Sequence, residues 1–339
     1  MSARRRLSAA THRRLAAVAL SAGLAVGLSS CGLAGSVVGL HDAPVEVTGG
    51  APINEQTAAA ITARVLADAA VARAKTGAAG TDARKDLLAG SALTMAEAAL
   101  ASKQTVEAPD ALATTPTPTV LAISRGEQWP RTILATTLDQ TSSTQLLHVL
   151  VSRTPTSRFV LTASVPLLAG ASVPALGPVA RGVPVPADDK DLVAEPAAVL
   201  KEYAAGLAFP RAGAAPDVEL TDALSTSLRS NAAAQAKGLG TLATLNQTQA
   251  PDPAVTLTFP LADGSALVFG QLVRTDAITL AKAAKELVLP APVAALVGKA
   301  KVTKAVTVTS LESVVMVVPV QGKAKVIGAD EQLASATAR

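Results

Sequence analysis

The first clear hydrophobic pattern of the chain is an apolar run near its N-terminus. Residues 15–28 hold only Leu, Ala, Val, Gly and one Ser, and the 14 residues before them carry five arginines and no acidic side chain. This apolar core is short for a permanent span, because crossing a bilayer takes about 20 apolar residues. A basic head followed by a short apolar core is typical of a secretory signal.

The apolar run ends in Leu28-Ser29-Ser30-Cys31, which resembles the lipobox of bacterial lipoproteins. The resemblance implies that Cys31 is diacylated on its sulfur, becomes the first residue of the mature chain and holds the protein at the outer face of the cell membrane. Cys31 is the only cysteine of the chain, which suits lipid attachment better than a disulfide or a metal site. The alternatives are an uncleaved membrane helix or a plain signal, and the export route, general secretory or twin-arginine, stays open.

After a Gly-rich stretch the pattern becomes helical. Asn54 fits a helix N-cap, and apolar side chains follow it at helical spacing. The stretch 75–81 contains two glycines and ends this helix, and a second helical piece carries Leu87 and Leu88. Thr94–Glu97 matches a capping box, which predicts a third short helix ending near residue 103.

From Thr119 the apolar positions alternate, which indicates β-strands. The pattern predicts strands at 120–123, 132–138, 145–152 and 159–165, with turn-like segments between them. The third of these strands is apolar on both faces, so we expect it to lie in the centre of its sheet.

A proline-rich stretch follows at 165–196. It holds six prolines, and the acidic residues Asp188, Asp189 and Asp191 lie inside it. Because proline fixes φ and lacks a backbone donor, we interpret this stretch as a semi-rigid connector and place a domain boundary in it.

The second half repeats the order of helices followed by strands. Residues 197–209 and a segment capped by Thr221 are expected to be helical, and Thr275 or Asp276 is expected to cap a helix that runs to Leu287. A hairpin turn is expected at Asp263-Gly264. The strands expected in this half are 254–259, 267–273, 302–309, 314–318 and 325–327.

These patterns predict an α+β fold of two similar halves, each with helices packed on an antiparallel β-sheet. The expected divisions are a signal peptide at 1–30, a lipidated cysteine and tether at 31–51, a first domain at 52–168, a proline-rich connector at 169–195 and a second domain at 196–332. The internal repeat rests on the order of elements and not on residue identity. A single continuous sheet with helices on one face is the alternative.

Each half resembles the NTF2-like or cystatin-like domains, in which helices pack on a curved sheet. The whole chain is similar to actinobacterial lipoproteins that carry an uncharacterised extracytoplasmic domain.

Removal of the signal changes the charge balance of the chain. The whole chain has 30 basic and 26 acidic residues; without the five arginines of the signal 25 basic residues remain, and the net charge becomes 25 − 26 = −1. A near-neutral chain with 2% aromatic residues gives no support for nucleic-acid binding, which uses a basic face and stacking aromatic side chains.

Candidate catalytic and metal-binding residues are few. The mature chain has two histidines, His41 in the tether and His148 in a predicted strand. For His148 a buried, hydrogen-bonded role is a simpler interpretation than catalysis. Two separate histidines and one cysteine leave no ligand set for zinc, and no cofactor is expected. The sequence has no Ser-x-x-Lys, Gly-x-Ser-x-Gly, Gly-x-Gly-x-x-Gly or Walker motif, and the connector acids do not have EF-hand spacing.

Three functions follow, in order of preference. The first is a non-catalytic, membrane-anchored lipoprotein that serves as a binding or interaction module of the cell envelope, with another envelope protein as its partner. The second is a carrier of a lipid or other apolar ligand, which a closed apolar cavity would favour and well-filled cores would oppose. The third is a hydrolase built on two carboxylates from Asp217, Glu219, Asp222 and Asp263, which needs a pair within about 5–10 Å in one cleft.

Overall fold

The computed structural model describes residues 49–103, 117–139 and 142–339. The lipobox residues Leu28, Ser29 and Ser30, the acylation site Cys31, and His41 lie outside these ranges. The chain divides into two units, 1–47 and 48–339, and the description below concerns the second. Among the described helices, no segment combines the length and the apolar character that a membrane span requires.

Three helices open the described chain: α2 (Glu55–Ala74), α3 (Gly77–Leu87) and α4 (Gly90–Ala101). The predicted cap of the first helix is confirmed, because the Asn54 side chain accepts a hydrogen bond from the Thr57 amide at 2.8 Å. The predicted capping box is wrong. Thr94 lies inside α4, and its hydroxyl donates to the Ser91 carbonyl at 3.2 Å, within the helix that it was expected to start.

The first sheet is the predicted antiparallel meander. Its strands are β1 (Thr119–Ile123), β2 (Arg131–Asp139), β3 (Thr144–Ser152) and β4 (Val160–Pro166), in the order β1-β2-β3-β4. The predicted central place of the third strand is confirmed, because β3 pairs with both β2 and β4. One face packs Ile133, Leu150 and Leu161 against alanines of α2 and α4.

The proline-rich stretch is packed against the folded chain. It contains the short 3-10 helix η2 (Val179–Arg181), and Val173, Leu176 and Val185 contact a buried hydrophobic core. The amide of Leu168 donates to the Ile327 carbonyl at 2.9 Å, which ties the start of this stretch to the last strand of the protein. The domain division at 169–195 stays a prediction.

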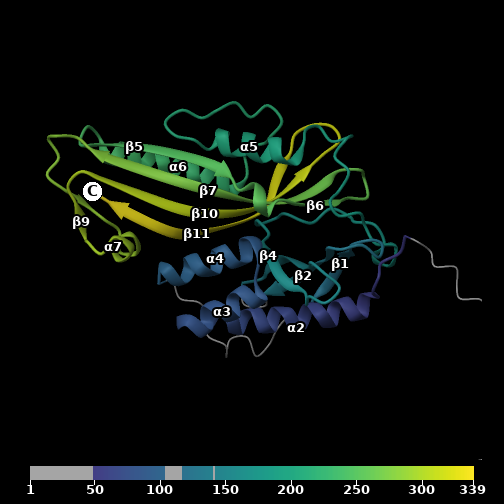
Figure 1. Ribbon diagram of the computed structural model, residues 1–339. Helices are drawn as coiled ribbons and strands as arrows, with labels where there is room; N and C mark the ends of the chain where they lie inside the picture. The colour runs from purple at the N-terminus through teal and green to yellow at the C-terminus, as the bar shows by residue number, and fades with distance from the viewer. Residues whose placement is uncertain (1–48, 104–116, 140–141) are drawn as a thin grey trace, which may run out of the picture. The chain divides into compact units, whose positions relative to one another are not determined.

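The second half begins with α5 (Pro196–Gly206) and α6 (Ala223–Leu239) and continues with β5 (Ala243–Pro251), the 3-10 helix η3 (Pro253–Val255), β6 (Leu257–Pro260), β7 (Ala266–Leu280), β10 (Ala305–Val318) and β11 (Lys325–Ala338). The second sheet has the order β11-β10-β7-β5, and β6 also pairs with β7 through a turn at Asp263-Gly264, as predicted. Between β7 and β10 lie β8 (Leu287–Val288), α7 (Ala291–Val297) and β9 (Lys301–Val302). Helices α5 and α6 cover one face of this sheet (Figure 1).

Several predictions for the second half are wrong in instructive ways. No helix begins at Thr275 or Asp276, because β7 continues to Leu280 and is paired on both sides by β5 and β10. The two strands expected at 302–309 and 314–318 are one long strand, β10. The cap of α6 is Asp222 and not Thr221, since its carboxylate accepts from the Ser225 amide at 2.8 Å. Strand β5 and helix α7 were not predicted.

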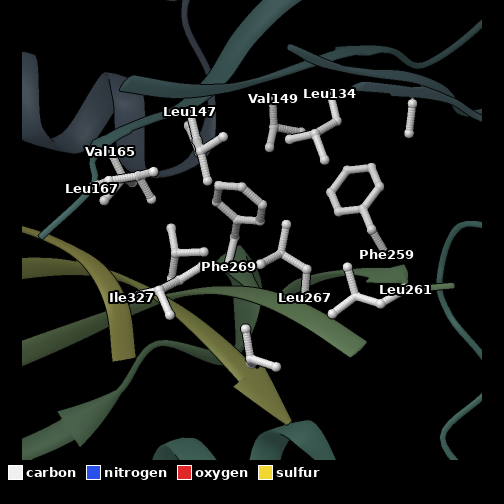
Figure 2. Close-up of a cluster of buried hydrophobic side chains, with 14 of the residues drawn as sticks. Leu134, Leu147, Val149, Val165, Leu167, Phe259, Leu261, Leu267, Phe269 and Ile327 are labelled. Atoms are coloured by element: carbon white, nitrogen blue, oxygen red, sulfur yellow. The ribbon is translucent and has the colours of Figure 1, made fainter. Parts of the chain in front are cut away.

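One hydrophobic core is shared by the two sheets. Figure 2 shows Leu134, Leu147 and Val149 of the first sheet facing Leu267 and Phe269 of the second. The α4 helix joins the sheets as well, because Ser102 at its C-terminal end hydrogen-bonds Gln332 of β11 and Thr94 within it hydrogen-bonds Gln271 of β7. The described residues therefore form an α+β fold with two large antiparallel sheets and the small two-stranded sheet β8–β9, and not the single continuous sheet of the alternative.

Candidate functional site

A charged cluster lies between the second sheet and its two covering helices. Its centre is Arg274 on β7, and strand pairing places acidic residues around it: Asp276 two positions along β7, Glu312 on β10 and Glu331 opposite Glu312 on β11. The guanidinium donates to Asp276 Oδ2 at 3.1 Å, to Glu312 Oε1 at 2.9 Å and to Glu331 Oε1 at 2.5 Å. It also donates to the Ser310 hydroxyl at 3.3 Å. One arginine thus holds three carboxylates in the layer between sheet and helices.

Burial dominates the electrostatics of this cluster. The Glu312 side chain is fully buried, and this burial raises its pKa to about 8 in spite of the opposing charge of Arg274. Burial also raises the pKa of Asp276. The pKa of Arg274 is raised, because the carboxylates around it outweigh its own desolvation. Arg274 thus faces two buried or half-buried carboxylates, Glu312 and Asp276, and the exposed carboxylate of Glu331, and its single positive charge does not offset the desolvation of the first two.

Hydrogen bonding in the cluster is incomplete. Asp276 Oδ1 and Glu312 Oε2 are buried and have no hydrogen-bond partner among the described residues, and the same holds for both polar atoms of the Gln249 amide. Gln249 on β5 is directly opposite Arg274 in the strand register, so it shares the face of the cluster. Buried carboxylate oxygens without partners are costly when ionised, which agrees with the raised pKa of Glu312.

A second polar group lies in the same layer. The hydroxyl of the fully buried Tyr203 on α5 donates to Asp222 Oδ1 at 3.1 Å. Burial and the neighbouring Asp222 carboxylate raise the pKa of Tyr203. The Asp222 carboxylate is fixed as the α6 cap, so it serves the helix terminus and the tyrosine together.

His148 has the buried role that was expected of it. Its Nε2 lies 2.8 Å from the Thr137 hydroxyl and its Nδ1 lies 3.1 Å from the Ser164 hydroxyl, from the strands on either side. Burial, with a smaller contribution from the Arg73 charge, lowers the pKa of His148 to about 3. The imidazole is therefore neutral at physiological pH and bound within the sheet.

The other candidate acids are engaged in local contacts or exposed. Asp188 forms an exposed pair with Lys190 at 3.5 Å. Asp222 caps α6, and Asp263 accepts from the Ser265 amide at 3.0 Å in the β6–β7 turn. Asp217 lies in the loop before α6, where its amide donates to Glu202 Oε2 at 3.1 Å, and the neighbouring Glu219 is exposed. Within the described ranges, no group of three or more His, Cys, Asp or Glu residues could hold a metal ion.

The carboxylates that do converge were missed by the sequence analysis. Glu312 and Glu331 follow Arg274 by 38 and 57 residues, and only strand pairing brings them together. One signal was present: Glu312 interrupts a long apolar β pattern that ends in Val314–Val318. A charged residue on the buried face of such a strand calls for a partner of opposite charge.

The opposite face of the second sheet is rich in threonine. Strand register aligns Thr248 of β5, Thr275 of β7, Thr309 of β10 and Ser335 of β11 in one row across all four strands. The next positions on the same face are Thr244, Asn246, Thr279, Thr307 and Thr337. We call these nine residues the threonine face. Six of them are exposed, and the other three, Thr275, Thr307 and Thr309, are half-buried.

Comparison with known proteins gives one result. No curated protein and no solved structure matches the chain. A family model described as "Domain of unknown function (DUF8094)" matches residues 55–338, from the first residue of α2 to the last residue of β11. The chain therefore belongs to the DUF8094 family.

Proposed function

We propose that the protein is a non-catalytic, lipid-anchored binding or interaction module at the outer face of the cell membrane. The lipobox resemblance at Leu28–Cys31 supports the anchor. The partner expected in this setting is another envelope protein. Nucleic acid is not proposed, because a near-neutral mature charge of −1, from 25 basic and 26 acidic residues, gives it no support.

The threonine face is the observation that carries this proposal. Its row of Thr248, Thr275, Thr309 and Ser335 crosses four paired strands, which hold the hydroxyls in a fixed array. None of the nine residues of the face is charged. A rigid array of hydroxyl and methyl groups suits contact with a polar, uncharged partner surface, because it adds hydrogen bonds without the desolvation cost of burying charge.

Two titratable groups that could take part in chemistry, Arg274 and His148, are bound to neighbouring side chains within the fold. Arg274 engages three carboxylates, and His148 is held between two hydroxyls with a lowered pKa. These contacts support a structural role for both groups, which agrees with the non-catalytic part of the proposal.

The finer description of the fold belongs to the same proposal. We infer that 52–168 and 196–332 are two similar halves of the NTF2-like or cystatin-like kind. The support is the order of elements: α2–α4 precede the meander β1–β4, and α5–α6 precede the second antiparallel sheet.

A carrier of a lipid or other apolar ligand is the alternative. The core shared by the two sheets would be its site, since it is lined by Leu and Val side chains. Phe259 and Phe269 pack edge to face in this core with ring centroids 5.9 Å apart, so aromatic rings occupy the space between the sheets (Figure 2). Native mass spectrometry of the chain from Gly32 tests the carrier: a stoichiometric extra mass that organic extraction removes would establish it.

The interaction module is tested by crosslinking from the threonine face in cells. A photoreactive amino acid replaces Thr248 in the lipidated protein, and replaces the exposed Thr156 of the β3–β4 turn in the control. We expect one discrete crosslinked product from position 248 that the neighbouring substitution Thr309→Lys abolishes, and no such product from position 156. Equal crosslinking from the two positions, or none from either, would contradict an interaction at this face.

A further inference from the structure

Two connections of the second half, α6–β5 and β7–β10, and the end of β11 meet at one end of the second sheet. The Ala281 amide, just after β7, donates to the Leu242 carbonyl in the α6–β5 turn at 2.8 Å. The Leu280 amide donates to the Lys304 carbonyl at 2.8 Å. The Arg339 amide donates to the Ala305 carbonyl at 2.9 Å, which brings the last residue to the same place. Helix α7, β9 and the end of β11 lie together at this end in Figure 1.

This end carries a concentration of positive charge. Seven basic residues lie at this end: Lys237 in the last turn of α6, Lys282, Lys285, Lys299, Lys301 and Lys304 between β7 and β10, and Arg339 after β11. We call them the lysine end. All seven are exposed. The segment 281–304 contains a single acid, Glu286, which pairs with Lys301 at 2.5 Å. In a mature chain of net charge −1, from 25 basic and 26 acidic residues, this is a strong local excess of positive charge.

Exposed aliphatic side chains lie among these lysines. Val288 of β8 is 64% exposed and Leu242 of the α6–β5 turn is 55% exposed. They are the two most exposed large hydrophobic residues in the described part of the chain. Lysines around exposed aliphatic tips are the combination that binds an anionic bilayer, because the ammonium groups meet lipid phosphates while the tips enter the headgroup region.

We propose that the lysine end docks on a bilayer of anionic phospholipid, as a contact separate from the lipid anchor. The proposal rests on the proposed function for the presence of a membrane near the protein, but the docking itself needs no acyl chain.

Two features favour lipid over a protein or a polymer as the occupant. Six of the seven cations are lysines, which act as point charges on flexible stems and do not give the paired, planar recognition that arginine gives to a defined carboxylate or phosphate. The aliphatic tips of Leu242 and Val288 would gain nothing from a soluble polyanion, whereas a headgroup layer buries them.

The first experiment measures vesicle binding without the anchor. The chain from Gly32 keeps the whole unit 48–339 and lacks the acylated cysteine. Its sedimentation with phosphatidylcholine vesicles is compared with that on vesicles containing phosphatidylglycerol. We expect binding only to the anionic vesicles, weakened by salt. The triple variant K282E/K285E/K304E should lower the partition at least about tenfold, since each lysine near an anionic surface contributes a several-fold factor.

The matched control is K75E/K201E/K323E, which makes the same charge change at exposed lysines outside the lysine end. It should bind nearly as the parent does. Circular dichroism spectra of both triple variants report whether the fold is kept. Equal losses in the two variants would mean that total charge and not this surface governs binding, and would overturn the proposal.

The second experiment asks whether the aliphatic tips enter the lipid. The chain from Gly32 has no cysteine, so Val288→Cys and the control Gln128→Cys, in the β1–β2 turn, each take one environment-sensitive dye. We expect a blue shift on anionic vesicles for position 288 alone. A soluble poly(glycerol phosphate) that binds the lysine end as strongly as the vesicles do, with no dye shift on vesicles, would assign the surface to an anionic polymer and overturn the proposal. Loss of anchoring in a Cys31 variant would leave this result unchanged, so the two proposals fail independently.

Discussion

Arg274 and Glu312 show how one buried charge pair organises a layer of the protein. The guanidinium contacts three carboxylates on β7, β10 and β11, so it ties together three adjacent strands of the second sheet. Pairing with Arg274 lowers the cost of burying Glu312 but does not remove it, because Glu312 Oε2 has no partner among the described residues. Removal of Arg274 alone would leave three carboxylates without their cation.

The raised pKa of Glu312 makes stability depend on pH. Its pKa is about 8 in the fold, above the 4.5 of an ordinary glutamate, so the folded protein binds more protons than the unfolded chain between these values. The free energy of unfolding should therefore fall as the pH rises from about 4.5 to about 8. We expect this decrease to be a few kcal/mol at most and to be smaller in the Glu312→Gln variant.

Urea unfolding between about pH 7.5 and pH 8.5 checks this prediction, because His148 is neutral in the fold and, with an ordinary pKa of 6.5, is also largely neutral in the unfolded chain there. Glu219→Gln changes an exposed carboxyl in the loop before α6 and serves as the control. If the parent protein and Glu312→Gln have the same slope, Glu312 is ionised throughout this range.

His148 makes the free energy of unfolding depend on pH in the opposite direction. Its pKa is about 3 in the fold and 6.5 in an ordinary histidine, so the unfolded chain binds more protons between these values. The free energy of unfolding should fall as the pH drops from about 6.5 towards 3. We expect His148→Gln to lower the free energy of unfolding by about 1–3 kcal/mol at neutral pH, because its hydrogen bonds would be imperfect. On acidification the free energy of unfolding of this variant should fall less than that of the parent. Thermal unfolding at a series of acid pH values measures both effects, and an unchanged acid dependence would show that other groups cause it.

At the scale of elements, the two sheets meet backbone to backbone where β4 runs into β11. Gly328 of β11 is bridged to Leu167, and a Cβ at Gly328 would lie 2.9 Å from the Pro166 carbonyl oxygen. Backbone atoms cannot move aside as a side-chain tip can. The absence of a side chain at Gly328 therefore sets how closely β11 approaches the end of β4.

We expect Gly328→Val to destabilise the protein by about 1–3 kcal/mol, because the added side chain must push β4 and β11 apart. The control is Gly238→Ala near the end of α6, where a Cβ meets nothing within 4 Å. In an exposed helix this control should stabilise by up to about 1 kcal/mol. Denaturant midpoints of the two variants should shift in opposite directions, and a neutral Gly328→Val would mean that the two strands separate freely.

Two predictions for the second sheet failed because its strands carry polar residues: a helix was expected at Thr275-Asp276, and strand β5 was missed. The Thr275-Asp276 pair has the composition of a helix start, but Thr275 belongs to the threonine face and Asp276 to the Arg274 cluster on opposite sides of β7. Strand β5 was missed because its inward positions include Gln247 and Gln249, which gave no apolar alternation. Both errors have the same cause: the buried layer of this sheet is partly polar.

At the scale of the whole molecule, anchoring and folding belong to different parts of the chain. We expect Cys31→Ala to release the protein from the membrane fraction into the medium or an uncleaved precursor pool, because the acylated sulfur is lost. Fractionation followed by mass spectrometry of the N-terminal peptide measures this, with Ser36→Ala, which lies just beyond the cysteine, as the control. Full membrane retention of Cys31→Ala at the mature mass after a high-salt wash, which weakens electrostatic docking at the lysine end, would contradict a lipid anchor.

The sequence by itself determined the helices α2 and α5, the four-strand meander with β3 at its centre, the β6–β7 turn and the α+β class, because each depends on local periodicity or capping. It also identified His148 as a buried histidine. Only the tertiary structure decided the rest. The Arg274 cluster, the shared core of the two sheets, the threonine face and the lysine end all bring together residues that are far apart in sequence. Strand register and sheet packing fix these contacts, and no local pattern in the chain encodes which distant strands will pair.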